Sequence, residues 1–130
     1  MKSRDTLVRL KRFQADEKRR RVVQLNTMIA EFTRMSNDLE REITHEEQRA
    51  NINDPNHFAY PTYARAARVR RDNIVASLND LRDQLEEAEA QFKEANEELA
   101  KAQNQESRDR SGAMIEVVAD RHPAEMRRGV

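Results

Sequence analysis

The chain has 130 residues, and its 24 basic and 24 acidic side chains give a formal net charge of zero, which argues against a general nucleic-acid-binding protein. The absence of cysteine excludes disulfides, thiolate nucleophiles and cysteine-ligated metals. Charged residues make up 37% of the chain while glycine and proline total two and three, a composition typical of long helices and coiled coils. No apolar run approaches the roughly 20 residues that cross a bilayer, and the opening segment lacks the apolar core of a signal peptide, so we expect a cytoplasmic protein.

Residues from about 3 to about 50 are predicted to form the first helix. From Val22 onward its apolar side chains recur at alternating spacings of three and four residues, the pattern of a helix that packs along one partner. Two positions of this stripe, Ser36 and Glu46, are polar. The apolar seam of the first helix is predicted to comprise Val22, Leu25, Ile29, Phe32, Leu39 and Ile43.

The first turns of this helix differ from the rest. Their apolar residues do not continue the stripe that begins at Val22, so a shift of register is expected before that residue. Either Ser3 or Asp5 is expected to cap the start of the helix. Apolar groups away from the seam lack a cover in a two-helix hairpin, so they and the basic residues among them form a candidate surface for another protein. This candidate surface comprises Leu7, Leu10, Phe13, Arg9, Lys11 and Arg12.

Residues 51–61 are predicted to form a loop, because Asn, Asp and two prolines within eleven residues break any helix. Three of the six aromatic residues of the chain, Phe58, Tyr60 and Tyr63, cluster at this tip, and Arg65 is the first of four arginines that follow. Two interpretations remain open. The rings either pack over the end of the coil or form an exposed recognition surface, where aromatics and arginine supply most binding energy.

Residues from about 62 to about 110 are predicted to form the second helix. Of eleven positions at heptad spacing from Ala67 to Ala102, ten are apolar, and Arg71 is the exception. A stop is expected at Ser111 and Gly112, and residues 111–130 are expected to form a flexible tail with a short helical turn around 114–119. The apolar seam of the second helix is predicted to comprise Leu78, Leu81, Leu85, Phe92 and Leu99.

The charge pattern predicts an antiparallel pairing within one chain. Residues 1–21 carry a net charge of +6 and residues 80–100 carry −6, while residues 38–47 carry −4 and residues 67–76 carry +2. Folding the chain back about the loop brings opposite signs together along both stretches, including Lys18 to Arg21 beside the acidic 86–98 stretch. The predicted fold is therefore all-α: a long antiparallel two-helix coiled-coil hairpin, residues 3–110, followed by the flexible tail.

The sequence offers no catalytic constellation, so no enzyme, no cofactor and no metal site are expected. A glycine-rich phosphate loop is absent, because Gly112 and Gly129 are the only glycines. The histidines are scattered singly, and lone residues make poor metal sites. The run Lys18–Arg21 has three interpretations: a charged face that answers the acidic stretch opposite, a surface that docks an acidic protein, or a nucleic-acid or membrane patch.

Two segments of the chain resemble a known family. The opening residues 1–21 read MKSRDTLVRLKRFQADEKRRR, and the tip residues 54–73 read DPNHFAYPTYARAARVRRDN. Both resemble the FliJ family of flagellar type III export proteins, in its alphaproteobacterial branch, over roughly residues 1–105. The resemblance implies an antiparallel coiled coil similar to the central shaft of rotary ATPases, which inserts its terminal end into the hexameric ring of the export ATPase, contacts the cytoplasmic part of the membrane export gate and escorts unloaded export chaperones.

The resemblance also implies which residues serve these contacts. The gate contacts of the family lie near the tip, where Tyr60 and Tyr63 match an aromatic-x-x-aromatic pattern, whereas Arg70 departs from better-studied members. At the terminal end, the candidate surface described above would meet the interior of the ATPase ring. The location implied is the cytoplasmic face of the inner membrane near the flagellar base. The alternatives are a generic coiled-coil scaffold or adaptor and a nucleic-acid-binding hairpin. The predicted gate-binding residues are Phe58, Tyr60, Tyr63, Arg65, Ala67 and Ile74.

Overall fold

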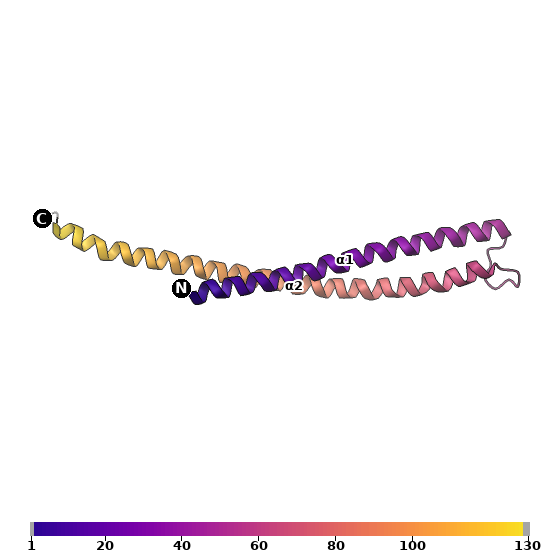
Figure 1. Cartoon of the computed structure of the whole chain (residues 1–130), viewed down its shortest axis with the longest axis horizontal. Helices are drawn as coiled ribbons and strands as arrows, with labels where there is room; N and C mark the ends of the chain where they lie inside the picture. Colours follow the sequence, from indigo (N-terminus) through magenta and orange to yellow (C-terminus); the bar gives the residue numbers. More distant parts are fainter. Residues whose placement is uncertain (1, 129–130) are drawn as a thin grey trace. The chain divides into compact units, whose positions relative to one another are not determined.

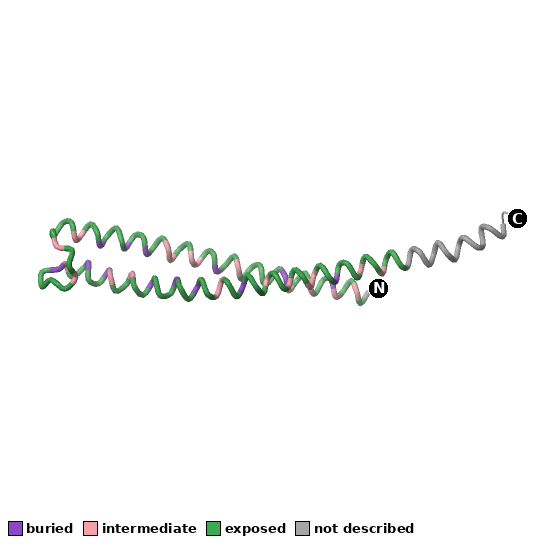
Figure 2. The backbone as a smooth tube through the Cα atoms, turned by 180° about the vertical axis from the view of Figure 1, so that it is seen from behind, coloured by how far each residue is buried: buried purple, intermediate pink, exposed green. Residues whose placement is uncertain are grey.

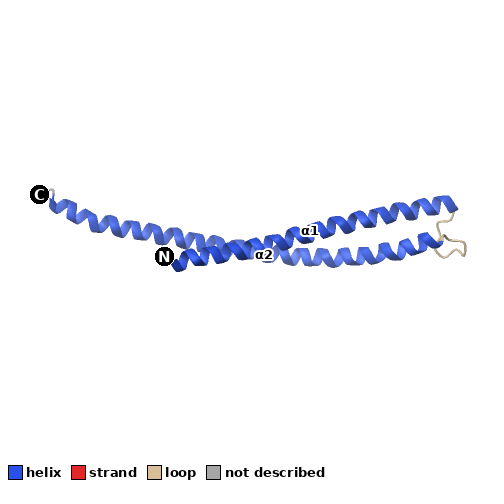
Figure 3. Ribbon diagram, in the orientation of Figure 1, coloured by secondary structure: helices blue, strands red, loops and turns tan. Residues whose placement is uncertain are grey.

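A computed structural model describes residues 2–128 of the chain, and the side chains of residues 3–112. Its two helices, α1 (Lys2–Ala50) and α2 (Thr62–Arg128), are joined by a loop over residues 51–61 (Figures 1 and 3). The described residues contain no strand. The predicted all-α helical hairpin and the position of its loop are confirmed. Within the part of the chain that the structure describes, neither helix contains a stretch long and apolar enough to cross a membrane.

The start of α1 differs from the prediction. The helix begins at Lys2, so Ser3 and Asp5 lie inside its first turn, and the prediction that one of them caps it is wrong. Asp5 keeps a favourable place there, because a carboxylate in the first turn opposes the positive end of the helix dipole. The start of α2 at Thr62 agrees with the prediction.

The end of α1 is fixed by one residue in the left-handed conformation. Asn51 has a φ of 53°, and asparagine is one of the few residues with a side chain that reaches this region at low cost. Its N–H donates to the carbonyl of Gln48 at 3.2 Å, and the N–H of Ile52 donates to the carbonyl of Glu47 at 3.2 Å. These two bonds form a Schellman motif, which satisfies carbonyls that the last turn of a helix leaves free.

The predicted stop of α2 at Ser111 and Gly112 is wrong, since the helix runs through both residues to Arg128. Glycine ends a helix when it takes a positive φ, and Gly112 does not. A single glycine inside a helix costs only about 1 kcal/mol relative to alanine, which the neighbouring turns offset. Residues 114–119, where a short helical turn was expected, are part of α2. Whether residues 111–130 are flexible remains a prediction, and the side chains from 113 on lie outside the described residues.

The chain divides into two units, which are described separately. The first unit combines residues 1–19 with residues from 90 onward, and the second unit comprises residues 20–89. Because α1 and α2 each contribute to both units, each unit contains one stretch of each helix. The second unit also contains the loop.

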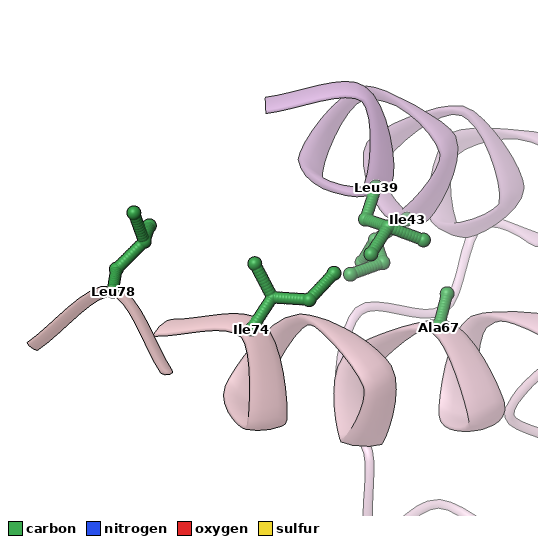
Figure 4. Close-up of a cluster of buried hydrophobic side chains, with 5 residues drawn as sticks. All are labelled: Leu39, Ile43, Ala67, Ile74 and Leu78. Atoms are coloured by element: carbon green, nitrogen blue, oxygen red, sulfur yellow. The ribbon is translucent and has the colours of Figure 1, made fainter. Parts of the chain in front are cut away.

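The second unit holds two clusters of buried apolar side chains. In one, Leu39 and Ile43 of α1 point toward Ala67, Ile74 and Leu78 of α2 (Figure 4). The other cluster is centred on Leu25, Leu81 and Ala88 and includes partly buried residues around them. Figure 2 shows that the buried and half-buried residues of these helices lie on the faces turned toward each other. Each seam residue predicted in this unit is buried or half-buried, namely Val22, Leu25, Ile29, Phe32, Leu39, Ile43, Leu78, Leu81 and Leu85.

Ion pairs between the helices of the second unit confirm the antiparallel register predicted from charge. Arg71 pairs with Glu40, and Arg68 pairs with Glu47 at 2.9 Å. These residues belong to the basic and acidic stretches that were expected to meet. Arg71, the polar exception of the α2 stripe, therefore occupies a seam position where its guanidinium reaches the carboxylate across the hairpin.

The first unit has a thinner apolar seam. The buried apolar residues are small, Val8, Ala15 and Ala102, and the larger seam residues Phe92 and Leu99 are half-buried. Their seam placement agrees with the prediction.

Cations take the remaining seam positions of α1 in the first unit. Arg4 donates to the side-chain oxygen of Gln105 at 2.7 Å, Lys11 to Glu98 at 2.7 Å, and Lys18 to Gln91 at 3.2 Å. The three cations are spaced seven residues apart along α1, and their acceptors are spaced seven residues apart along α2, which is the repeat of a coiled coil. Lys18 thus lies beside the acidic 86–98 stretch as expected, but its acceptor is a neutral amide.

The predicted shift of register before Val22 is therefore wrong. In the sequence, Arg4, Val8, Lys11, Ala15 and Lys18 continue the alternating spacing that leads to Val22, and the contacts above place them on the seam. An apolar pattern misses such positions, because a lysine or arginine packs its aliphatic stem along the partner helix while its charged end reaches a polar group.

Candidate functional site

Hydrogen bonds order the loop that joins the helices. Asp54 begins a turn in which its side chain accepts the N–H of Asn56 at 3.0 Å and its carbonyl accepts the N–H of His57 at 3.0 Å. A second turn follows, in which the His57 carbonyl accepts the N–H of Tyr60 at 3.1 Å. The Nδ1 atom of His57 also accepts the N–H of Ala59 at 3.0 Å. Short polar side chains that bind the backbone in this way favour a fixed turn over a floppy loop.

Tyr60 closes the loop onto both helices. Its side chain is only 4% exposed, and its hydroxyl donates to the Glu47 carboxylate of α1 at 2.8 Å. Arg68 of α2 donates from Nε to the same hydroxyl at 2.8 Å and from Nη2 to Glu47 at 2.9 Å. The guanidinium groups of Arg65 and Arg68 lie 5.5 Å and 5.8 Å from the centre of the Tyr60 ring, within the range of a cation–π contact. Tyr60, Glu47 and Arg68 are called the tip latch below.

The contacts within the tip latch change the pKa values of Glu47 and Tyr60. The hydrogen bonds from Arg68 and from Tyr60 hold the pKa of the Glu47 carboxyl below its ordinary value. Burial, and then the hydrogen bond to Glu47, raise the pKa of the Tyr60 hydroxyl. At neutral pH, Glu47 is therefore an anion that accepts two hydrogen bonds, and Tyr60 is a neutral donor. This arrangement satisfies each polar group of the latch and fixes the path of the loop.

The other two aromatic residues of the tip are on the surface. Phe58 is 94% exposed, and its ring stacks on the imidazole of His57 with 4.8 Å between ring centres. Tyr63, in the first turn of α2, is 55% exposed, and its hydroxyl donates to Glu42 of α1 at 2.8 Å. That hydrogen bond raises the pKa of Tyr63. The sequence left open whether the tip rings pack over the end of the coil or are exposed. The ring of Tyr60 packs, whereas the rings of Phe58 and Tyr63 are exposed.

An open groove runs beside Tyr63 on the face of the second unit. It has a volume of about 540 Å³, and a neighbouring hollow of about 200 Å³, which also includes Met35 and Arg70, adjoins the same tyrosine ring. Three carboxylates and one arginine line the larger groove, so its lining is net negative. The residues that line the larger groove are Asp38, Arg41, Glu42, His45, Glu46 and Tyr63.

The structure divides the set of residues predicted to bind the gate. Phe58, Tyr63 and Arg65 are exposed near the tip. Ala67 and Ile74 are buried in the apolar cluster between α1 and α2, and Tyr60 is buried in the latch. A partner that meets the tip of the folded hairpin therefore reaches the first three residues and not the last three.

The predicted terminal surface is divided in the same way. Leu10 and Phe13 are 49% and 56% exposed on the outer side of α1, and Arg9 and Arg12 are exposed beside them. Leu7 is half-buried. Lys11 lies in the seam, where its ammonium group binds Glu98 and lowers the pKa of that carboxyl. Four of the six predicted residues are therefore available on the surface of the first unit.

The other buried polar side chains of the described residues have hydrogen-bond partners within the chain. No buried side-chain nitrogen or oxygen of residues 3–112 lacks a hydrogen-bond partner. The described residues bring no three histidine, aspartate or glutamate side chains together in a way that holds a metal ion. The features that stand out among the described residues are the exposed large hydrophobic side chains, namely those of the tip and those on the outer face of α1 in the first unit.

The tip latch is the feature that the sequence did not reveal. Glu47 and Arg68 are 21 residues apart, and a hydrogen bond between them depends on the register of the hairpin. The available signal was the position of Glu47 in the last turn of α1, one heptad after Glu40 on the same face of the helix. Comparisons of this chain with models of protein families, with curated proteins and with solved structures found no match.

Proposed function

We propose that this chain is a non-enzymatic component of a flagellar type III export apparatus, with the part that FliJ-family proteins play. In this proposal it is a coiled-coil stalk that promotes assembly and activity of the export ATPase ring. It also links the ring to the cytoplasmic part of the membrane export gate and escorts export chaperones. It would work at the cytoplasmic face of the inner membrane, near the flagellar base, and reach the membrane through its partners alone.

The observation that carries the proposal is the sequence of the tip, residues 54–73, which resembles that of the FliJ family. Heptad repeats alone would match many unrelated coiled coils, whereas this stretch combines a turn, two exposed aromatic rings and a run of arginines. In the structure it forms an ordered loop and the first turns of α2, so the resembling segment is a defined surface. The helical hairpin is also the fold that the resemblance implies.

A second support is the exposed apolar surface of the first unit. Leu10 and Phe13 lie on the side of α1 away from the seam, with Arg9 and Arg12 beside them. Exposed apolar groups with basic neighbours are typical of a surface that another protein covers. In the proposed function the covering partner is the interior of the ATPase ring, and the tip surface of the second unit meets the gate.

The test is a pair of variants with opposite expected effects. The double variant Leu10→Ala with Phe13→Ala should weaken stimulation of the cognate export ATPase and leave binding of the gate's cytoplasmic domain unchanged. Tyr63→Ala should weaken gate binding about tenfold or more, because truncating an aromatic anchor costs about 2–4 kcal/mol, and should leave ATPase stimulation unchanged. Both interactions are measured with purified proteins, and circular dichroism checks that each variant keeps its helix content.

Two results would contradict the proposal. If the unaltered chain neither stimulates the ATPase nor binds the gate domain, a scaffold in another system is favoured. If the chain instead binds DNA with an affinity that falls steeply as salt rises, the exposed arginines serve a nucleic acid. Loss of both interactions to the same extent in both folded variants would mean that the two surfaces do not have separate partners.

A further inference from the structure

The first unit holds the start of α1 against α2 with little apolar contact. Among the described residues, both clusters of buried apolar side chains lie in the second unit, within residues 20–89. On the α1 side of the first unit, the buried apolar residues are Val8 and Ala15. Because apolar burial is the main stabilising contribution in a coil of this kind, the start of α1 gains less from packing than the stretch of α1 that follows it.

Polar contacts in the first unit add little to this packing. Lys11 pairs with Glu98 and Arg4 pairs with Asp109, and these four side chains are between 26% and 45% exposed. Ion pairs that are so open to solvent contribute little to stability. At the seam itself, Arg4 and Lys18 donate to neutral side-chain amides of α2 and not to carboxylates.

The charges of the two paired stretches balance poorly. Residues 1–19 contain seven basic and three acidic side chains, whereas residues 90–112 contain four basic and five acidic side chains. The start of α1 therefore carries a net charge of +4 beside a stretch of net charge −1, which leaves most of the repulsion among its own cations uncompensated. A densely acidic part of α2, residues 80–89, belongs to the second unit.

The two helices of the first unit differ in how well each remains helical without the other. The α1 stretch is the end of a helix that begins at Lys2, whereas α2 runs from Thr62 to Arg128 and so continues on both sides of its paired stretch. A helix end frays more readily than a helix interior. The α2 stretch is also rich in Ala, Glu, Gln and Lys, which favour helix, and Glu106 and Arg110 form an ion pair four residues apart along it.

We propose that residues 2–19 of α1 form a releasable strap. This strap detaches from α2 and closes again, while α2 stays helical and the helices of the second unit remain paired. Release uncovers the seam face of α2 at Phe92 and Leu99, which are half-buried in the closed form, and leaves the basic start of α1 free to move. The strap is a property of the chain alone, so it does not rest on the proposed function.

Hydrogen exchange of backbone amides, measured by nuclear magnetic resonance on the full chain and corrected for intrinsic rates, tests the strap. Residues 6–19 are compared with residues 90–110, because these two stretches pack against each other. If the strap is released from an intact α2, amides of residues 6–19 should exchange at least about tenfold faster than those of residues 90–110. Amides of residues 29–43, in the core of the second unit, should also exchange more slowly than those of the strap.

A pair of valine variants changes the release without changing the rest of the hairpin. Val8→Ala removes apolar carbons that the closed strap buries, so exchange in residues 6–19 should become at least about fivefold faster. Exchange in residues 29–43 should stay within about twofold of the unaltered chain. Val23→Ala is the matched control, because Val23 is a valine of α1 that is 57% exposed in the second unit, and it should leave exchange in the strap unchanged. Circular dichroism checks that both variants keep their helix content.

Three results would overturn the strap. Exchange in residues 6–19 as slow as in residues 29–43 would show that the start of α1 stays docked. Equal exchange in residues 6–19 and residues 90–110 would show that the two helices of the first unit unwind together. If Val8→Ala accelerated exchange in residues 29–43 as much as in residues 6–19, the hairpin would open as a whole and not from its start.

Discussion

The two units of the hairpin are built from the same two helices but hold them together differently. In the second unit most seam positions hold large apolar side chains, with Ser36 and Arg71 as polar exceptions, and Leu25 is 0% exposed. In the first unit the buried apolar residues are a valine and two alanines, and cations of α1 occupy seam positions at heptad spacing. Burial of apolar area is the main stabilising contribution in such a coil, so we expect the second unit to be the stable one.

The polar seam of the first unit has a different use. A polar pair at a seam position lowers stability, but it favours a register in which the cation meets its acceptor, and the seven-residue step of these pairs disfavours any slip that is not a whole heptad. Arg4, Lys11 and Lys18 each meet a polar partner on α2. The comparison therefore teaches that one hairpin combines a region chosen for stability with a region chosen for register.

The largest effect is expected from cutting a core side chain of the second unit. Leu81 is 6% exposed in the cluster with Leu25, so Leu81→Ala should lower the free energy of unfolding by about 2–4 kcal/mol. Leu99→Ala in the first unit is the matched comparison, and it should cost about 1 kcal/mol, because Leu99 is only half-buried. Urea titrations followed by circular dichroism measure both. Equal losses would contradict the difference between the units.

Sequence patterns predicted the second unit well, and the reason is visible at Leu78 and Leu81. Large apolar residues at seam spacing are the signal that pattern analysis counts, and they are also the residues that pack. In the first unit the same analysis failed at Lys11, because a cation at a seam position reads as a surface residue. For the same reason, the analysis assigned Leu7 to a separate apolar stripe before Val22.

The candidate site was predicted in its location and not in its details. The cluster of aromatic residues marked the tip, but no feature of the residue pattern distinguished the buried Tyr60 from the exposed Phe58. That separation comes from the path of the loop, which brings Tyr60 to Glu47 and Arg68. Likewise, Gly112 carried the usual signal of a helix end, and the preference of a single residue was too weak to stop the helix.

A smaller effect, of opposite sign, is expected from replacing a polar seam pair. The double variant Lys11→Leu with Glu98→Leu should raise the free energy of unfolding slightly, since a solvated ion pair contributes little and the leucine side chains add apolar surface to the seam. The control is Arg12→Leu with Glu97→Leu, which makes the same change in charge on exposed positions. Hydrogen exchange of backbone amides in the first unit provides the local readout. Faster exchange there than in the unaltered chain would show that the ion pair stabilises the unit.

The smallest effect concerns pH and one carboxylate from each unit. A hydrogen bond from Lys11 lowers the pKa of Glu98 in the first unit, and hydrogen bonds from Arg68 and Tyr60 lower the pKa of Glu47 in the second. A carboxyl with a lowered pKa in the folded state stabilises the fold above its ordinary pKa, and this contribution is lost as the pH falls through the lowered value.

Both units should therefore lose stability as the pH drops below the ordinary glutamate value of 4.5. Glu47→Gln should flatten this dependence for amides near the tip, and Glu98→Gln should flatten it for amides of the first unit, because each removes one titrating group. Hydrogen exchange at a series of pH values, corrected for the intrinsic rates, distinguishes the two regions.

Glu98 is the more solvated of the two carboxylates, with a side chain 45% exposed against 15% for Glu47, and solvent weakens its ion pair. The flattening should therefore be greater at the tip, and a greater flattening in the first unit would mean that the polar seam, and not the latch, holds the stronger charge pair.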